Sequence, residues 1–354
     1  MATKYQEIAD TLKTRILSGE FDEVKVLPTE QVLSTFFHAS RQTVRQALSL
    51  LVKDGLIVRR QGSGSRLVEQ HQLHANSQRF VAVIASYISH YIFPSMLREV
   101  ENVLSSNNCS PLLFATQNQV LTERKILQSL LHQSVDGILV EGTKTALFNP
   151  NLDLYRQLMD RGIPLVFIHG NYAELKGPPA VLDDNEGGGR QLVEHLVRKG
   201  HTSIAGIFKS DDIQGHGRYA GFATALRDAG LPVDDSHIFW YHTELKELLM
   251  SKNCPFDLMN TINGCSAVVC YNDEIANHLV SLLLQKGVRV PEDVAVVSFD
   301  NSQYSEFCAV PLTSLSHGDR NVGGTAAEKL VKLMNGEPCD SELVPWTLVE
   351  RCSG

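Results

Sequence analysis

The sequence lacks the features that mark membrane proteins, metalloproteins and the common hydrolases. Its 354 residues hold no apolar run near the roughly 18 residues that a membrane helix needs. The spacings GxSxG, HExxH and CxxC, which carry nucleophile, zinc-protease and zinc-knuckle chemistry, are all missing. We therefore expect no catalytic residues, no cofactor and no metal. The protein is expected to bind its partners and not to convert them.

Cysteine is sparse and unpaired in its spacing. The seven residues, an odd number, are Cys109, Cys254, Cys265, Cys270, Cys308, Cys339 and Cys352. They indicate reduced thiols that serve mainly in packing, since no disulfide framework is suggested. The first residues mix charges at helical spacing, where a secretory signal would have a basic start and an apolar block. We expect a cytoplasmic protein.

Charge is distributed unevenly along a chain long enough for two or three packed units. The net charge is -8. Residues 1–68 hold ten Lys/Arg against seven Asp/Glu, a balance of +3, so the remainder carries -11. Only the N-terminal part is therefore electrostatically suited to phosphates.

Three short helices and a hairpin are predicted within residues 1–68. Residues 4–18 have one apolar face and end at a serine and a glycine, Thr29 can cap a second helix through about residue 36, and Ser40 can cap a third. Residues 56–60 and 66–68 have strand character around a glycine-rich turn. The third helix is predicted to bury four apolar side chains at i, i+3, i+4 and i+7 and to end at Asp54 and Gly55: Val44, Ala47, Leu48 and Leu51.

The outward face of this third helix has the side chains that a DNA-reading helix uses. Arg41, Gln42 and Thr43 lie in its first turn, and Arg45 follows one turn later on the face of Arg41. Arginine forks suit guanine, an amide suits adenine, and a hydroxyl suits phosphate. Lys4 is a further candidate for phosphate, and Gln61 and Gly62 at the hairpin tip for the minor groove or backbone. The alternative is a solvated helix face that happens to be basic.

Four short motifs in residues 4–68 resemble the winged-helix head of the GntR family of bacterial regulators. They are LPTE at 27–30, SRQTVR at 40–45, DGLI at 54–57 and QGSG at 61–64. Gln31 departs from the family, because many members have arginine there. The resemblance implies operator DNA as a partner, with base and phosphate contacts from these residues: Glu30, Gln31, Arg41, Gln42, Thr43, Arg45 and Gln61.

A polar, aperiodic segment at 69–78 predicts a linker between a DNA-binding domain at 1–68 and a body at 79–354. In the body, short apolar runs alternate with helical patterns, which predicts parallel sheets with crossover helices and a ligand beyond the carboxyl ends of the strands. Strands are expected near 80–85, 112–114, 136–140, 164–168, 203–208, 266–270 and 294–299. Helices are expected near 95–106, 121–133, 152–161, 187–199, 217–229 and 273–286.

Five body segments resemble the sugar-binding bodies of LacI-type repressors and periplasmic binding proteins. They are HLVRKGH at 195–201, RYAGF at 218–222, YND at 271–273, PEDVAVVSFD at 291–300 and PLTSL at 311–315. The implied fold class is α/β: a winged helix-turn-helix followed by two doubly wound lobes of the type I periplasmic-binding-protein kind, with ligand between the lobes. LacI-type bodies dimerise, so we expect a homodimer on a two-fold operator.

A GntR-type head on a LacI-type body resembles the bacterial arabinose-operon repressors. The segments YISHYIFP at 87–94 and EGTK at 141–144 strengthen this similarity. The resemblance implies L-arabinose as the small-molecule effector and repression that the sugar relieves.

A polyol site needs polar groups that bind neighbouring hydroxyls, and an aromatic face for the sugar's C–H surface. Arg218, Asn272 and Asp300 match ligand-contacting positions of the resembled family. By register with neighbouring motifs, His169, Asp183 and His317 match as well. Tyr91 and Phe93 are candidate aromatic walls, and Glu141 and Lys144 are candidate polar partners. The alternatives are a surface ion pair for Arg218 at the start of a helix, a satisfied loop histidine for His169, and core packing for Phe93.

Other functions stay open at this point. Gly187, Gly188 and Gly189 open a helix, but no Walker lysine follows, so close packing is favoured over phosphate binding. An enzyme would turn candidate sugars over, and a transport module would lack residues 1–68. A regulator of the same architecture could instead sense another sugar or a purine, or activate transcription.

Overall fold

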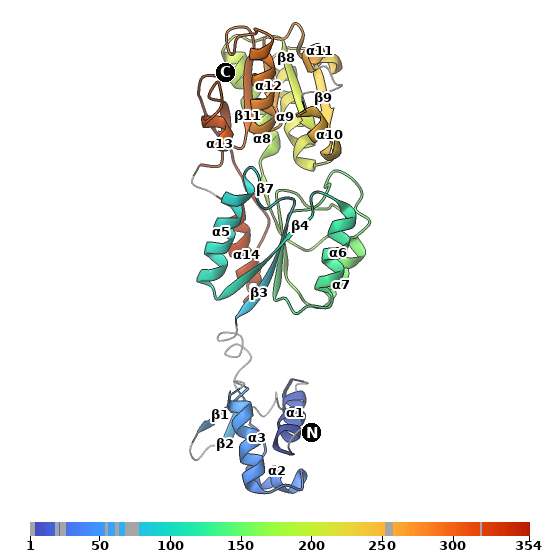
Figure 1. Ribbon diagram of the computed structural model, residues 1–354, viewed down its shortest axis with the longest axis vertical. Coiled ribbons are helices and arrows are strands. Elements are labelled where there is room, and N and C mark those ends of the chain that lie inside the picture. Colours follow the sequence, from blue (N-terminus) through green and yellow to red (C-terminus); the bar gives the residue numbers. More distant parts are fainter. Residues whose placement is uncertain are drawn as a thin grey trace. The chain divides into compact units, whose positions relative to one another are not determined.

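The computed structural model describes residues 4–17, 21, 26–53, 56–60, 64–67, 78–251, 258–318 and 321–354. The chain divides into two compact units, residues 1–79 and 80–354 (Figure 1). Of the segment 69–78 that we expected to be a linker, only residue 78 lies among the described residues. The predicted stops at Gly19 and at Asp54 and Gly55 lie outside them.

The first unit contains three helices and a hairpin. The helices are α1 (Lys4–Leu17), α2 (Glu30–Phe36) and α3 (Arg41–Lys53), and the strands β1 (Ile57–Arg60) and β2 (Gly64–Leu67) pair antiparallel. Val26 forms an isolated bridge with Arg66 beside the hairpin. Strand β2, the second strand of the hairpin, begins at Gly64, two residues earlier than we predicted.

The predicted caps and the buried stripe of this unit are confirmed. The Thr29 hydroxyl accepts a hydrogen bond from the backbone N–H of Val32, and the Ser40 hydroxyl accepts one from Thr43 at 3.1 Å. All four predicted side chains of α3, Val44, Ala47, Leu48 and Leu51, are buried. They share one core with α1, because Ile8, Leu12 and Ile16 are buried in the same cluster.

The second unit contains two six-stranded sheets, which define two lobes. The sheet of the first lobe has the order β13-β7-β6-β5-β3-β4, and that of the second lobe β14-β12-β11-β10-β8-β9. The first-lobe strands are β3 (Arg79–Ala85), β4 (Cys109–Ala115), β5 (Gly137–Val140), β6 (Leu165–Ile168), β7 (Ala180–Asp183) and β13 (Glu342–Val344). The second-lobe strands are β8 (Ile204–Lys209), β9 (Ile238–Tyr241), β10 (Ala267–Cys270), β11 (Ala295–Phe299), β12 (Thr313–Ser316) and β14 (Thr347–Val349).

Helices cover both faces of each sheet, as parallel strands buried on both faces require. In the first lobe, α5 (Phe93–Ser106) and α14 (Val322–Met334) lie on one face, and α6 (Val120–Leu130) and α7 (Leu152–Asp160) on the other (Figure 1). In the second lobe, α8 (Asn185–Arg198) and α9 (Ile213–Asp228) pack on one face. On the other lie α11 (Leu258–Ile262) and α12 (Asp273–Gln285) with α10 (Thr243–Leu249), and shorter elements are η1 (Asp235–His237) and α13 (Gln303–Glu306).

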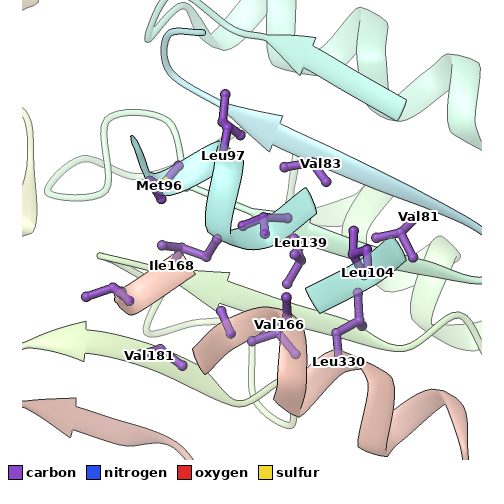
Figure 2. Close-up of a cluster of buried hydrophobic side chains, with 14 of the residues drawn as sticks. Val81, Val83, Met96, Leu97, Leu104, Leu139, Val166, Ile168, Val181 and Leu330 are labelled. Carbon is purple, nitrogen blue, oxygen red and sulfur yellow. The ribbon is translucent and has the colours of Figure 1, made fainter. Parts of the chain in front are cut away.

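Each strand sends alternate side chains into different cores. Val81 and Val83 of β3 face the core under α5 and α14, together with Leu139 and Val166 of neighbouring strands (Figure 2). Their neighbour Ala82 instead faces the core under α6 and α7. This alternation explains why the strands are apolar throughout and why their positions were predictable.

The chain passes between the lobes at three places: after β7 at Asp184, between β12 and α14, and between β13 and β14 at Pro345 and Trp346. All seven predicted body strands and all six predicted body helices are confirmed within a few residues. Helix α9 begins four residues earlier than predicted, so Arg218 lies inside it and not at its start. Within the described residues, no helix is long and apolar enough to cross a membrane.

Helices α8 and α9 approach each other unusually closely, and glycine permits it. A Cβ atom on Gly189 would lie 2.1 Å from the carbonyl oxygen of Arg218, and one on Gly221 would lie 1.9 Å from that of Glu186. The glycines that open α8 thus serve close packing, as we favoured over phosphate binding. The contact fixes the backbone of α9 at Arg218.

Candidate functional site

The exposed face of α3 presents the predicted DNA-reading side chains of the first unit. Arg41, Gln42 and Arg45 are exposed, whereas the Thr43 hydroxyl lies 2.8 Å from that of Ser40. The Arg45 guanidinium forms an ion pair of 2.9 Å with Glu30 at the start of α2, although Arg45 is 64% exposed. Two residues expected to contact DNA therefore contact each other.

The remaining predicted head residues are more scattered. The Lys4 ammonium donates a hydrogen bond of 3.1 Å to the carbonyl oxygen of His38, which ties α1 to the turn between α2 and α3. Gln31 is exposed on α2. Gln61 and Gly62 lie outside the described residues.

In the second unit, six of the ten predicted residues meet near the carboxyl ends of the parallel strands, where ligands bind in such sheets. We call this set the interlobe cluster. It draws on both lobes and on a crossover segment and consists of Tyr91, His169, Asp183, Arg218, Asp300 and His317.

Arg218 is the most enclosed cation of the cluster, at 2% exposure. Its guanidinium donates to the carboxylate of Asp300 at 3.2 Å, to the side chain of Asn185 at 3.0 Å and to the backbone oxygen of Tyr271. Burial alone would lower the pKa of Arg218, but Asp300, Tyr271, Asp183 and Tyr91 together outweigh it, and the pKa is raised. The arginine is a fixed positive charge and not a surface ion pair.

Three aromatic rings surround the same guanidinium. Its central carbon lies 4.2 Å from the ring centroid of Phe299, 4.7 Å from that of Tyr271 and 5.6 Å from that of Trp346. Such cation–π contacts hold the plane of the guanidinium in one orientation. Sequence reasoning missed all three rings as parts of the site.

Tyr91 links the lobes within the cluster. It lies in the first lobe, and its hydroxyl donates to the Asp300 carboxylate of the second lobe at 2.6 Å. The same hydroxyl accepts from the backbone N–H of Asp273 at 3.1 Å. Burial and the nearby Asp300 carboxylate raise the pKa of Tyr91 well above its usual value, so the phenol stays protonated. Its ring stacks on that of Tyr304 with centroids 5.9 Å apart.

Asp183 holds two histidines from opposite sides. His169 Nδ1 lies 3.0 Å from one carboxylate oxygen and His317 Nε2 lies 2.8 Å from the other, while Gln214 donates to the carboxylate at 2.7 Å. Burial disfavours the charged form of both residues, but the attraction and hydrogen bonding between the histidines and the carboxylate outweigh it. The pKa of His169 rises to about 9, and that of Asp183 falls well below its usual value. His169 adopts a left-handed backbone with φ of 64°, which aims its ring at Asp183.

Two ring nitrogens at the cluster lack a protein partner. Nε2 of His169 and Nε1 of Trp346 are buried without a hydrogen-bond partner among the described residues, whereas Nε2 of His317 is paired with Asp183. The rings of His317 and Trp346 stack at 3.8 Å. Buried polar atoms are normally hydrogen-bonded, so these atoms point to a polar molecule that completes the site.

The other predicted residues lie around the cluster or apart from it. Glu141 accepts a hydrogen bond of 2.6 Å from the backbone N–H of Ser86, and its burial raises its pKa. The Asn272 side chain caps α12 by accepting from Ile275 at 3.1 Å. Lys144 contacts carboxylates of the second lobe, Glu244 at 2.5 Å and Asp211 at 4.0 Å.

Phe93 belongs to the core and not to the cluster. Helix α5 begins at Phe93, two residues earlier than predicted, so this side chain points toward the sheet and packs edge-on against Tyr87 at 5.6 Å. The missed residues had weak sequence signals. Trp346, one of only two tryptophans, lies in a crossover between two three-residue strands where no periodicity marks it.

Comparison with known proteins places both units. Residues 4–67 match the bacterial regulatory proteins of the gntR family, and residues 193–353 match the periplasmic binding protein-like domain. The crystal structure of the transcription regulator CcpA of Lactococcus lactis is 26% identical, with a TM-score of 0.68 over 78% of this chain and 99% of that chain. A transcriptional regulator CelR–cellobiose complex, 22% identical with a TM-score of 0.67 over 93% of this chain and 100% of that chain, shares the fold.

A winged-helix head with a two-lobed binding body defines a bacterial transcription regulator. The chain is 34% identical to the arabinose metabolism transcriptional repressor of Halalkalibacterium halodurans, over 96% of this chain and 92% of that protein. The corresponding repressor of Geobacillus stearothermophilus is also 34% identical, over 95% of this chain and 93% of that protein. The chain belongs to the family of arabinose metabolism transcriptional repressors.

Proposed function

We propose that the protein represses arabinose-utilisation genes by binding operator DNA, and that L-arabinose bound at the interlobe cluster releases it. In this proposal, residues 1–68 read DNA, residues 69–78 connect, and residues 79–354 bind sugar and dimerise. The protein acts in the cytoplasm as a homodimer on a two-fold operator. It binds the sugar and returns it unchanged.

One observation carries the sugar part of the proposal: charged groups fixed at the lobe boundary stand beside buried polar atoms that have no partner. Arg218 and Asp300 supply a donor fork and a carboxylate, while His169 and Trp346 each keep one ring nitrogen free of protein partners among the described residues. Sugar hydroxyls donate and accept at once, so they satisfy both kinds of group. The ring of Trp346 stacks on that of His317 beside them.

The names of the relatives support arabinose over other effectors, since both repressors named above act in arabinose metabolism. The DNA part rests on the exposed α3 face with Arg41, Gln42, Thr43 and Arg45. We propose that five further residues of the head contact the DNA in support of this face: Glu30, Gln31, Lys4, Gln61 and Gly62. In the body, four further residues are proposed to contact the sugar or to hold the lobes around it: Tyr91, Glu141, Lys144 and Asn272.

An operator titration tests the proposal. The full-length protein is bound to fluorescent operator DNA, and L-arabinose, D-ribose, D-xylose, D-galactose or hypoxanthine is added while anisotropy is recorded. We expect release by L-arabinose, with operator affinity reduced roughly 5- to 150-fold by a coupling of about 1–3 kcal/mol. A tighter complex would reverse the sign of the proposed regulation. Release by hypoxanthine or another sugar instead would replace arabinose as the effector.

A further inference from the structure

A buried carboxylate outside the predicted site clamps the loop that carries Asp300. Asp273 is the first residue of α12 and is fully buried. One carboxylate oxygen accepts from the Ser298 hydroxyl at 2.5 Å and from the Ser314 hydroxyl at 2.6 Å. The other accepts from the backbone N–H and the hydroxyl of Ser302, at 2.6 and 2.9 Å. Four donors thus converge on one side chain, and none of them is a cation.

The loop that these bonds hold has an uncommon backbone. Asp300 and Asn301 both have positive φ values, 94° and 42°. Two successive left-handed residues other than glycine persist only where the surroundings fix them. Ser314 holds this loop through two hydrogen bonds: its hydroxyl donates to Asp273, and its oxygen accepts from the backbone N–H of Asn301 at 3.1 Å. Arg351 holds the loop from the opposite side through the Asn301 side chain at 2.7 Å.

Asp273 also contacts the first lobe, through its backbone. The N–H of Asp273 donates to the Tyr91 hydroxyl, which in turn donates to Asp300. The side chain of Asp273 therefore sets where the Asp300 carboxylate stands, and its backbone sets where the phenol that bridges the lobes stands. Neither function requires contact with a ligand.

We propose that Asp273 is a positioning residue for effector binding: it holds Asp300 in the geometry that engages Arg218 and Tyr91. The inference deepens the proposed function, and its effector arm rests on it. Disruption of the Asp273 clamp frees the 300–302 loop and misplaces the carboxylate, while the groups of the site all remain present.

The ionisation of Asp273 gives a signature that simple loss of packing lacks. Burial and the nearby Asp300 raise the pKa of Asp273 to about 6. Protonation removes acceptor capacity from the clamp, so effector affinity should fall as the pH falls through about 6. Tyr91, Cys270 and Cys308 also face this carboxylate, but each has a raised pKa and does not ionise in this range.

The charged residues near Asp273 are all engaged in ion pairs of their own. Asp300 is paired with Arg218, Arg351 contacts Glu306 at 3.3 Å, and Glu274 on the same helix pairs with Lys246 at 2.5 Å. Glu274→Gln is therefore the matched control: it neutralises a carboxylate in the same helical turn but leaves the clamp intact.

The experiment uses the full-length protein and two readouts. Hydrogen exchange without sugar reports the Ser302 and Asn301 amides, and calorimetry with L-arabinose from pH 5.5 to 7.5 reports effector affinity. For Asp273→Asn we expect exchange of these amides and the dissociation constant at pH 7 each to rise about tenfold or more, the effect of losing a charge-assisted hydrogen bond. The pH dependence near 6 should disappear. Glu274→Gln should stay within about twofold of wild type, because its pair with Lys246 is partly solvent-screened and lies outside the clamp.

Exchange and affinity of Asp273→Asn equal to those of Glu274→Gln would overturn the inference. If wild-type protein binds no L-arabinose, the proposed effector is wrong, and the exchange readout still decides whether Asp273 holds the loop. Ser314→Ala keeps the carboxylate and serves if Asp273→Asn does not unfold cooperatively. It should accelerate exchange at Asn301, because it removes that residue's acceptor, and unchanged exchange there would count against the clamp.

Discussion

The two sets of proposed binding residues are built in opposite ways. In the first unit, Arg41, Gln42 and Arg45 follow one another on a single helix and are exposed. In the second unit, Arg218 and Asp300 come from segments 82 residues apart and are enclosed and paired with each other. An exposed set needs only a well-capped helix, whereas a buried charged set needs all its partners at once. Substitutions should therefore act locally in the head and collectively in the body.

The largest effect is expected for Arg218→Ala. Removal of a buried guanidinium leaves Asp300 uncompensated and takes away a cation from between three aromatic rings. A guanidinium fork that donates to two sugar hydroxyls contributes about 1.5–3 kcal/mol through each bond, so L-arabinose affinity measured by calorimetry should fall by more than about a hundredfold. Arg190→Ala is the control, because its ion pair with Asp228 lies on the surface. Operator affinity without sugar should persist in both variants, and equal sugar affinity in the two would move the site elsewhere.

The second-largest effect is expected in the pH dependence of the free energy of unfolding, and it arises from the His169–Asp183 pair. The folded pKa of His169 is raised from 6.5 to about 9, so its contribution is fully present below about pH 6.5 and is lost as the pH rises through about 9. Asp183 has a lowered pKa, so its contribution is present above about pH 4 and is lost as the pH falls through the folded pKa. The free energy of unfolding in urea should drop by up to about 3 kcal/mol between pH 6.5 and 9.5.

His169→Asn removes the titrating ring and tolerates the left-handed backbone, since asparagine is enriched there. Its unfolding free energy should vary much less with pH over the same interval. The control is His132→Gln, an exposed histidine, which should reproduce the wild-type curve. A wild-type curve that is flat from pH 6.5 to 9.5 would show that the pair is not ionised in the way that its geometry indicates.

How far the sequence predicted the molecule follows from the same contrast. Helical and strand periodicity located α3, β3 and the other long elements, because each pattern is local. Family resemblance supplied Arg218 and Asp300 as candidates. The rings of Tyr271 and Trp346 could not be predicted, because they reach Arg218 from separate strand ends through tertiary packing alone. Phe93 was proposed as a sugar-facing wall because it is aromatic, but it begins α5 and packs in the core, which was the alternative.

A third, smaller effect tests the head. Arg45→Ala should weaken operator binding by about 1–3 kcal/mol for each head, the range for one arginine–guanine contact, with sugar affinity unchanged. Lys53→Ala is the matched control, because it removes the same charge from the last turn of α3. Gel shifts of Arg45→Ala that match those of Lys53→Ala would exclude a base contact. Glu30→Gln, which frees Arg45 from its ion pair, shows whether the pair orients the arginine or competes with DNA.

The smallest effect is expected at the ion pair between Lys144 and Glu244. This pair is accessible to solvent, as the charged residues of the head are. This pair joins the two lobes at 2.5 Å, but Glu244 is 47% exposed and Lys144 18% exposed, so solvent screens it. Lys144 lowers the pKa of Glu244 to about 2, so the pair is ionised from about pH 4 upward. Because the pair joins residues of different lobes, we expect its loss to lower the fraction of molecules in which the lobes are closed on each other. Apparent sugar affinity falls by that same fraction.

Exposed pairs contribute about 0.2–1 kcal/mol, so Glu244→Gln should weaken L-arabinose binding by no more than about fivefold. Lys144→Met should act equally if the lysine serves only closure, and a double-mutant cycle should then show that the two changes are not additive. A much larger loss for Lys144→Met alone would mean that its ammonium contacts the sugar directly. High salt provides the last discrimination: it should abolish the difference between Glu244→Gln and wild type, because screening already removes most of an exposed pair. It should leave the defect of Arg218→Ala intact, since a buried pair is screened far less.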